Sequence, residues 1–334
     1  MQMYMLITDR CNLNCSMCIR GNNYGNDMDF ETLKDPSFID KISQDTVVIT
    51  GGEPTIHNNF IEIVKHICKY AKNVAVTTNG TFDYYINDLK EEKNLIFQVS
   101  LDGYSEKHDA IRGEGTYQKT MNTLKKLDVS GVKYSVASVV NKNNKDYIKD
   151  LINELKELKN MRYWRVSYEM PFGHADFKNM MSVQEWNGLV DEIIKEAKFR
   201  VKIQKIFPFE LYDKFMENID VNNNLLNRCF NCGSGRDKVY VYPDFSVYSC
   251  TCLTDFCIGN LQESSLKQIL CGEEIKAFSN YKIDEGIPCR ECEYYALCNG
   301  GCIGMSYHFF GEIGKGDIRC PILRRYYEKK NILL

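Results

Sequence analysis

The feature that most constrains this chain is a group of three cysteines, Cys11, Cys15 and Cys18, spaced CxxxCxxC directly after the apolar run at residues 4–7. A short apolar run that ends in polar and turn-forming residues predicts a buried parallel strand followed by a loop. A structural zinc or iron-sulfur site normally takes four protein ligands, and this loop contains neither a histidine nor a fourth cysteine. Three thiolates would leave one iron open for a cofactor or a substrate.

The distribution of all fifteen cysteines divides the chain into two parts. Three lie in residues 11–18, one is Cys68, and eleven lie in residues 229–320. The first residues lack the basic segment and the long apolar segment of a signal peptide, so we expect a cytoplasmic protein. In a reducing compartment, so many thiols favour metal binding over disulfides.

Charge and hydropathy argue against two classes of partner. The chain has 42 basic and 45 acidic residues, and its net charge of -3 gives no bulk attraction for nucleic acid or for an anionic membrane. It also contains no run of about 18 uninterrupted apolar residues. We therefore expect no nucleic-acid and no membrane partner, and a partner must be recognised by local sites.

Apolar segments recur at intervals that suit alternating strands and helices, at residues 4–7, 46–49, 74–76, 95–99, 134–140 and 163–168. Amphipathic helices are predicted between them, and Ser182 with Glu185 forms a capping box that opens a further helix. Six such repeats with parallel strands predict a doubly wound α/β sheet or a barrel. A barrel brings the carboxyl ends of its strands to one site, which the motifs below require. A boundary near Pro208 divides the chain into residues 1–207 and a small cysteine-rich part, residues 208–334.

Polar motifs follow the second, third and fourth predicted strands. They are GGEP at residues 51–54, TTNG at 77–80 and SLDG at 100–103, and HDAIRG follows at 108–113. Two adjacent glycines allow a backbone to approach a ligand closely, since no Cβ intervenes, and Glu53 supplies an acceptor. The planar fork of Arg112 can hold a carboxylate through two hydrogen bonds. Taken alone, each motif is also compatible with a simple turn or a surface ion pair. The prediction of a shared binding site therefore depends on their common position at strand ends.

With the cysteine loop, these segments resemble the motifs of the radical S-adenosylmethionine (radical SAM) superfamily. The resemblance implies that Cys11, Cys15 and Cys18 hold a 4Fe-4S cluster whose open iron is chelated by S-adenosylmethionine, and that one electron from the cluster cleaves this cofactor to a 5'-deoxyadenosyl radical. In the family, GGEP contacts the methionine ammonium group, TTNG lies beside the adenosyl group, the serine of SxDG reaches the ribose, and the arginine pairs with the methionine carboxylate. The residues that the resemblance assigns to the cofactor are Met17, Gly51, Gly52, Glu53, Pro54, Thr78, Asn79, Ser100, Asp102 and Arg112.

A second cysteine pattern begins at residue 289 and is spaced CxxCx5Cx3C, with a further cysteine at residue 320. Together with two cysteines around the alternating, hairpin-like segment 240–250, it resembles the SPASM extension of radical SAM enzymes, which carries two auxiliary 4Fe-4S clusters. The resemblance thus implies a partial (β/α)6 barrel of the TIM type, followed by a small SPASM domain. It assigns the farther cluster to Cys289, Cys292, Cys298 and Cys320, and the nearer one to Cys232, Cys250 and Cys302. A pair of zinc-ribbon sites is the alternative.

The chain departs from the SPASM pattern in two ways. Phe245 stands where the family usually has glycine in the turn before Cys250, so we expect a differently shaped hairpin. Three surplus thiols also compete to be the fourth ligand of the nearer cluster, namely Cys229, Cys252 and Cys257. We favour Cys229, because some family members use a cysteine shortly upstream. Cys252 or Cys257, if not a ligand, is a candidate donor of a hydrogen atom to a Cα radical, which would make the enzyme an epimerase.

Members of the SPASM group mainly modify peptides, by crosslinking, oxidation or epimerisation. The resemblance therefore implies a precursor-peptide substrate and an external electron donor such as a flavodoxin or a ferredoxin. The chain begins almost at the first strand, so we expect no N-terminal leader-binding domain, and Thr251, where the sulfatase-maturing branch has an aspartate nearby, argues against sulfatase maturation. The alternatives are dehydrogenation of a small aminocyclitol or sugar-type alcohol, and a non-catalytic iron-sulfur or zinc protein, which would not need the GGEP, TTNG and SxDG segments.

Overall fold

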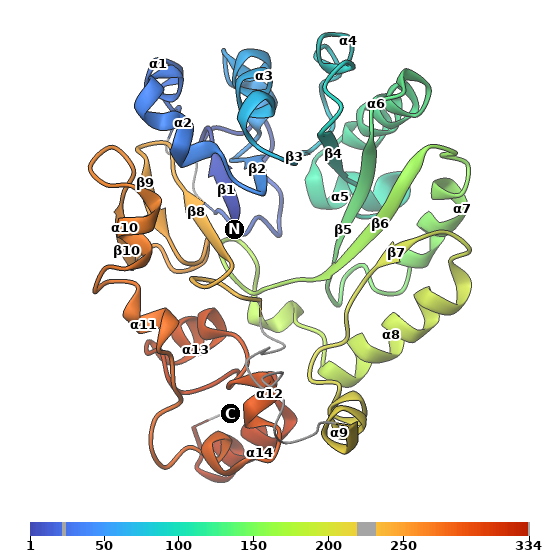
Figure 1. The fold of residues 1–334 in the computed structure, drawn as a ribbon. Coiled ribbons are helices and arrows are strands. Elements are labelled where there is room, and N and C mark those ends of the chain that lie inside the picture. Colours follow the sequence, from blue (N-terminus) through green and yellow to red (C-terminus); the bar gives the residue numbers. More distant parts are fainter. Residues whose placement is uncertain (22–24, 219–231, 333–334) are drawn as a thin grey trace.

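The computed structural model describes residues 1–21, 25–218 and 232–332, and its strands form one sheet that bends into an open arch (Figure 1). The strand order is β10-β9-β8-β1-β2-β3-β4-β5-β6-β7. Neighbouring strands are parallel from β8 through β1 to β7, whereas β8, β9 and β10 pair antiparallel. The strands are β1 (Gln2–Leu6), β2 (Thr46–Thr50), β3 (Val74–Thr78), β4 (Leu95–Ser100), β5 (Tyr134–Val140), β6 (Met161–Tyr168), β7 (Val201–Lys202), β8 (Lys238–Val241), β9 (Ser246–Tyr248) and β10 (Cys257–Asn260).

The six apolar segments predicted from the sequence are strands β1 to β6, so the expected βα alternation and the partial parallel barrel are confirmed. These strands are rich in β-branched and aromatic residues and have helices on their outer side, which is typical of a parallel sheet. The bulky side chains of Phe97, Tyr134 and Trp164 are fully buried. Trp164 also donates from Nε1 to the Ser138 hydroxyl at 2.8 Å, so that its polar atom is satisfied.

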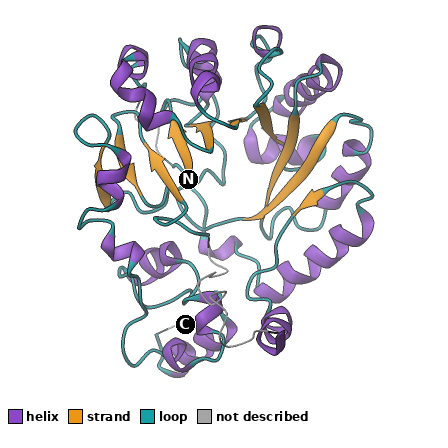
Figure 2. Ribbon diagram, in the orientation of Figure 1, coloured by secondary structure: helices purple, strands orange, loops and turns teal. Residues whose placement is uncertain are grey.

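Helices that connect the strands lie on the convex side of the arch, and the last helices of the chain gather beneath its open side (Figure 2). The α-helices are α1 (Phe30–Lys34), α2 (Pro36–Ile42), α3 (Phe60–Tyr70), α4 (Ile86–Leu89), α5 (Glu106–Arg112), α6 (Thr116–Ser130), α7 (Leu151–Leu155), α8 (Val183–Glu196), α9 (Phe209–Asn218), α10 (Leu266–Leu270), α11 (Lys276–Ser279), α12 (Tyr295–Cys298), α13 (Ile303–Phe310) and α14 (Pro321–Lys329). Single turns of 3₁₀ helix span Pro54–Ile56, Ile148–Asp150, Phe177–Asn179 and Pro288–Glu291. No helix in the described part of the chain is both long and apolar enough to cross a bilayer.

The capping box predicted for α8 is present, because the Ser182 hydroxyl accepts from the Glu185 N–H and the Glu185 carboxylate accepts from the Ser182 N–H. The helix buries its apolar face, led by Trp186 and Ile193, against the sheet. A satisfied N-terminus and one apolar face explain why this helix follows its sequence pattern so closely.

The β8–β9 hairpin extends the barrel sheet, since β8 pairs in parallel with β1 from Gln2↔Lys238 to Met5↔Val241. Phe245 adopts a positive φ of 65° in the turn, the left-handed conformation that glycine adopts most readily. Its ring is buried and meets Phe38 edge-on at 5.0 Å between ring centroids. Phe245 thus adopts a glycine-like backbone conformation, and burial of its ring offsets the cost. A hairpin shape that differs from the family's stays a prediction.

Two clusters of buried side chains form the interior. The larger one unites the barrel with residues up to Phe278, including the β8–β10 strands. The smaller one lies in the last part of the chain, around Ile283, Met305 and Leu323, and takes Phe172 from the loop after β6. The segment from β8 to α11 therefore packs as part of the barrel core, and the boundary between residues 207 and 208 stays a prediction.

Candidate functional site

The predicted motifs meet at one edge of the sheet, because β1 to β4 are parallel and in register. The cysteine loop follows β1, GGEP follows β2, TTNG includes the end of β3, and SLDG begins at the last residue of β4, Ser100. Ser100 is buried, as is Met17 in the cysteine loop. The strand-end convergence expected from the sequence thus brings four segments together at one site.

The GGEP backbone is hydrogen-bonded to the start of the cysteine loop, which spans residues 8–18. The Gly52 N–H donates to the Thr8 carbonyl at 2.8 Å, and the Glu53 N–H donates to the Arg10 carbonyl at 2.8 Å. A Cβ on Gly51 would collide with the Thr8 carbonyl oxygen, and one on Gly52 would collide with that of Arg10. Close approach of two backbones explains the pair of glycines, and the partner in this structure is the cysteine loop.

Glu53 is buried and accepts four hydrogen bonds at the base of the site. Its donors are the N–H and hydroxyl of Thr55 (3.2 and 2.6 Å), the hydroxyl of Thr78 (2.7 Å) and the N–H of Asn79 (2.7 Å). Burial raises the pKa of the carboxyl group, and these bonds oppose the rise. The same carboxylate caps the 3₁₀ turn that begins at Pro54, so it ties GGEP to TTNG.

The TTNG turn is also tied to the cysteine loop. The Asn79 amide donates to the Asn12 side-chain oxygen at 2.9 Å, and the Asn12 amide donates to the Thr81 hydroxyl at 2.9 Å. Asn12 lies inside the CxxxCxxC segment, where the sequence drew attention only to the cysteines and Met17. Each asparagine supplies both a donor and an acceptor, and together they hold the loop in place.

Arg112 and Asp102 form a buried ion pair, in which Arg112 Nε donates to Asp102 Oδ2. The other carboxylate oxygen, Oδ1, accepts from the Val139 N–H at 2.7 Å. Burial opposes the charge of Arg112, but the neighbouring Asp102 carboxylate favours it, and the pKa of Arg112 is raised. The guanidinium also lies within electrostatic range of Cys15. Asp102 therefore fixes the orientation of the Arg112 guanidinium beside the cysteine loop.

Cys11, Cys15 and Cys18 lie within electrostatic range of one another. Burial raises the pKa of the Cys11 thiol to about 11 and also raises that of Cys15. The loop after β6 contacts this segment, since the His174 N–H donates to the Cys18 carbonyl at 2.9 Å. Thiols are the ligands of iron-sulfur clusters, so this donor set fits the three-cysteine site that the spacing predicts.

The SPASM cysteines gather in two further groups. Cys289, Cys292, Cys298 and Cys320 interact electrostatically, and burial raises the pKa of Cys289 to about 12 and that of Cys298 to about 11. Cys232, Cys250 and Cys302 form the other group, together with Cys252. Cys229 lies outside the described residues. No three His, Cys, Asp or Glu side chains in residues 1–21, 25–218 and 232–332 are arranged to hold a single metal ion, whereas thiolates of a 4Fe-4S cluster bind different irons.

Cys257 and Cys252 differ in their surroundings. Cys257 is exposed on β10, where its thiol donates to the Gly259 carbonyl at 3.4 Å. Cys252 is partly buried, and its N–H donates to the Cys250 sulfur at 3.4 Å. The structure therefore separates the two thiols that the sequence treated as equivalent candidates.

A cleft of about 450 Å³ opens between the cysteine loop and the β8–β9 hairpin, with Cys252 and His308 in its wall. Arg20 bridges the two sides, since its guanidinium pairs with Asp9 (3.2 Å) and donates to the hydroxyls of Tyr242 (2.6 Å) and Thr251 (3.1 Å). The guanidinium also lies 4.5 Å from the Tyr242 ring centroid. Arg20 lies two residues beyond Cys18 and belongs to no sequence motif, so the sequence pattern does not reveal it.

Glu169 is a second residue that the sequence did not reveal. It follows β6 at the site edge of the sheet, is 3% exposed, and accepts from the Asn141 amide at 2.6 Å. Burial raises the pKa of Glu169 to about 7, and the Asn141 bond opposes the rise. A carboxyl group that titrates near neutrality inside a barrel mouth can exchange a proton there.

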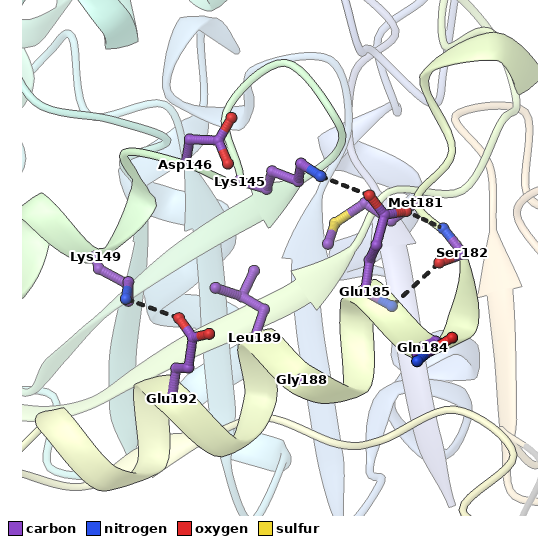
Figure 3. A pocket seen from close by; sticks show the side chains of 10 residues that line it. All are labelled: Lys145, Asp146, Lys149, Met181, Ser182, Gln184, Glu185, Gly188, Leu189 and Glu192. Atoms are coloured by element: carbon purple, nitrogen blue, oxygen red, sulfur yellow. Dashed lines mark hydrogen bonds and ion pairs between the residues drawn. The ribbon is translucent and has the colours of Figure 1, made fainter.

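Another groove, of about 460 Å³, lies between α8 and the loop after β5 and is lined by none of the motif residues (Figure 3). Its charges pair with one another, Lys145 with Glu185 at 2.5 Å and Lys149 with Glu192 at 2.7 Å. Solvent-exposed ion pairs of this kind contribute little to stability, and we assign no ligand to this groove.

Comparison with known proteins agrees with the geometry. Residues 5–155 match the family model of the radical SAM superfamily, and residues 229–293 match that of the SPASM iron-sulfur cluster-binding domain. A cysteine-type anaerobic sulfatase-maturating enzyme of Clostridium novyi is 25% identical over 361 residues, covering 96% of this chain and 92% of that protein. The subtilosin biosynthesis protein AlbA of Bacillus subtilis is 27% identical over 317 residues, covering 89% of this chain and 65% of that protein.

Two solved structures show the same fold. Streptococcus suis SuiB bound to its precursor peptide SuiA superposes with a TM-score of 0.80 at 18% identity, over 97% of this chain and 75% of SuiB. The enzyme anSMEcpe with bound AdoMet superposes with a TM-score of 0.71 at 19% identity, over 99% of this chain and 97% of that protein.

The contact between GGEP and the cysteine loop generates a first prediction. We expect Gly52→Ala to push the two backbones apart and to lower stability by about 1–3 kcal/mol, because the new Cβ meets the backbone of Arg10. Gly188→Ala in α8 is the matched control, since nothing lies within 4 Å of its Cβ, and it should stabilise by about 0.5–1 kcal/mol. Thermal unfolding of both variants measures the difference, and equal melting temperatures would contradict the role of this contact.

Glu169 generates a second prediction. Its pKa of about 7 in the folded chain exceeds the ordinary value of 4.5, so the folded state binds the proton more tightly and loses stability as pH rises from about 4.5 through about 7. Glu169→Gln removes this loss, so its melting temperature should match that of the wild type at pH 5 and exceed it at pH 8. The difference at pH 8 should correspond to about 1–3 kcal/mol in the free energy of unfolding. The exposed Glu114→Gln is the control. A Glu169→Gln difference that does not change with pH would refute the assignment.

Proposed function

This chain belongs to the radical SAM superfamily and carries a SPASM domain, and from this premise we propose that it cleaves S-adenosylmethionine reductively and abstracts a hydrogen atom from a peptide. One observation carries the proposal: Thr8 and Arg10, which lead into the CxxxCxxC segment, are hydrogen-bonded to GGEP, and Asn12 within the segment is hydrogen-bonded to TTNG. A loop that used its cysteines only for structure would not need these segments around it.

When bound, the cluster and S-adenosylmethionine would supply a 5'-deoxyadenosyl radical. Cys11, Cys15 and Cys18 would hold the cluster. The GGEP and TTNG segments, Ser100 and Arg112 would bind and orient the cofactor. Asp102 holds Arg112 in one orientation, which prepares the guanidinium for a carboxylate, because a preoriented fork loses little entropy on binding.

The cleft beside the cysteine loop supports a peptide as the substrate. Its volume of about 450 Å³ suits one side chain with its adjoining backbone. Its wall offers both donors and acceptors, from Asp9, Arg20 and His308, and a peptide backbone needs both. Two of the proteins compared are named for peptide substrates or products, AlbA by its role in bacteriocin biosynthesis and SuiB by its bound precursor peptide.

The proposal includes Cys11, Cys15 and Cys18 as ligands of the radical SAM cluster and an external flavodoxin or ferredoxin as the electron source. It also includes two auxiliary clusters, one held by Cys289, Cys292, Cys298 and Cys320 and the other by Cys232, Cys250, Cys302 and a fourth cysteine. It does not extend to sulfatase maturation, because Thr251 accepts a hydrogen bond from Arg20 where that reaction would need a carboxylate base. The cysteine groups at the SPASM end would carry the electron that leaves an oxidised substrate radical.

The cleavage reaction is a direct test. We expect the chain, reconstituted anaerobically with iron and sulfide and reduced with dithionite, to release 5'-deoxyadenosine from S-adenosylmethionine. Cys15→Ala should reduce release to background, because it removes one of three ligands. Cys271→Ala, an exposed thiol outside the three cysteine groups, should behave as the wild type. Release that survives Cys15→Ala, or a wild type that binds zinc and releases none, would refute the proposal.

The substrate class has its own test. We expect a short precursor peptide encoded beside this chain's gene to be modified, and Arg20→Lys to raise its KM about tenfold, because the lysine loses the fork that bridges Tyr242 and Thr251. Arg324→Lys, an exposed pair partner of Glu328, is the control and should leave KM unchanged. Mass spectrometry follows the peptide. If an aminocyclitol or a sugar-type alcohol is oxidised instead and the peptide is untouched, the peptide assignment is wrong.

A further inference from the structure

Cys252 lies among the three thiols assigned to the nearer auxiliary cluster. Its thiol hydrogen-bonds with that of Cys250, and it lies within electrostatic range of Cys232 and Cys302. These contacts join two distant parts of the chain, since Cys250 and Cys252 follow β9 and Cys302 immediately precedes α13. Among residues 232–332, Cys252 is thus the thiol that lies in this group in addition to the three cysteines assigned to the cluster.

The backbone around Cys252 holds its thiol on the same side as that of Cys250. The Cys252 N–H donates to the Cys250 sulfur at 3.4 Å, which closes a tight turn between the two cysteines. An N–H aimed at a sulfur is also the interaction that steadies a ligating thiolate. The turn therefore presents two thiols together, as a CxC pair of ligands would.

A second contact anchors this turn to the helix that begins after Cys302. His308, one of the residues of α13, bonds through Nε2 to the Cys252 carbonyl at 2.5 Å. Because the Cys302 backbone N–H also donates to Asp317 at 3.1 Å, the start of α13 is itself fixed. The position of Cys252 relative to Cys302 is thus set by packing between the hairpin and the helix.

The other surplus thiols of this region that the structure describes are placed differently. Cys257 is exposed and bonded to a backbone carbonyl, and Cys271 is exposed after α10. Cys229, which the sequence favoured, lies outside the described residues, so it enters as the competitor in the test below.

We propose that Cys252 is the fourth protein ligand of the nearer auxiliary cluster, beside Cys232, Cys250 and Cys302. The inference rests on the proposed function in one respect, that these thiols bind an iron-sulfur cluster. Four thiolates saturate a 4Fe-4S cluster, so this cluster has no open iron for a substrate thiolate and acts in electron transfer. Cys252 lines the proposed peptide cleft, so a cluster bound by Cys252 would lie beside the substrate and could accept the electron that leaves a substrate radical. Cys252 is then no hydrogen-atom donor.

The test measures the iron content of a full-length variant that lacks the radical SAM cluster. This background carries three substitutions, Cys11→Ala, Cys15→Ala and Cys18→Ala. After anaerobic reconstitution this background should hold about eight irons and eight sulfides, because two 4Fe-4S clusters remain. Adding Cys252→Ala should lower iron by about four or change the electron paramagnetic resonance (EPR) spectrum of the reduced protein. Cys252→Ser, which keeps an oxygen ligand, should retain more iron with shifted EPR features. Cys257→Ala is the matched control and should match the background.

Several outcomes would overturn the inference. If Cys252→Ala and Cys252→Ser leave both iron content and EPR spectrum unchanged while Cys229→Ala lowers them, Cys229 is the fourth ligand. If Cys252→Ala, made in the chain that keeps Cys11, Cys15 and Cys18, leaves the clusters intact but abolishes incorporation of solvent deuterium into product, Cys252 is a hydrogen donor. A background that takes up no iron contradicts the proposed function instead. Circular dichroism of each variant separates loss of a ligand from loss of fold, and the Ser variant gives the ligand test even if the Ala variant unfolds.

Discussion

The site depends on the backbone contact between the cysteine loop and the turn after β2. Two hydrogen bonds of 2.8 Å, from Gly52 to Thr8 and from Glu53 to Arg10, hold the loop against the end of a buried strand. The loop contains no helix or strand, so such contacts must fix its conformation. Without them, three thiols on a free loop would sample many arrangements, and the entropic cost of ordering them would fall on cofactor binding.

Buried polar groups then extend this order across the barrel mouth. Glu53 accepts hydrogen bonds from Thr78 and Asn79 of the TTNG turn. Asp102 pairs with Arg112 and also accepts a hydrogen bond from the Val139 N–H of β5. Removing either carboxylate would leave several buried donors without partners, which costs more than the hydrogen bonds themselves contribute. The mouth is therefore a connected polar network, and Glu169, bonded to Asn141, lies at its far side.

The continuity of the sheet links the two halves of the chain. Since β8 pairs with β1, the hairpin that precedes Cys250 is placed by the same strand that leads into Cys11. Arg20 adds a polar bridge from the cysteine loop to that hairpin. The distance between the first cysteine group and the nearer SPASM group is thus set by a hydrogen-bonded sheet, which is far stiffer than a linker between separate domains.

Local pattern in the sequence determined much of this protein: the six parallel strands, the α8 capping box, the strand-end motifs and the cysteine spacings all depend on residues a few positions apart. Tertiary structure alone decided the rest. The pairing of β8 with β1, the burial of Glu169 and the meeting of Cys252 with Cys302 join residues that are remote in the chain. The glycine-like backbone of Phe245 also follows from burial of its ring against Phe38. Such features depend on which surfaces pack together, and no local period in a sequence records that.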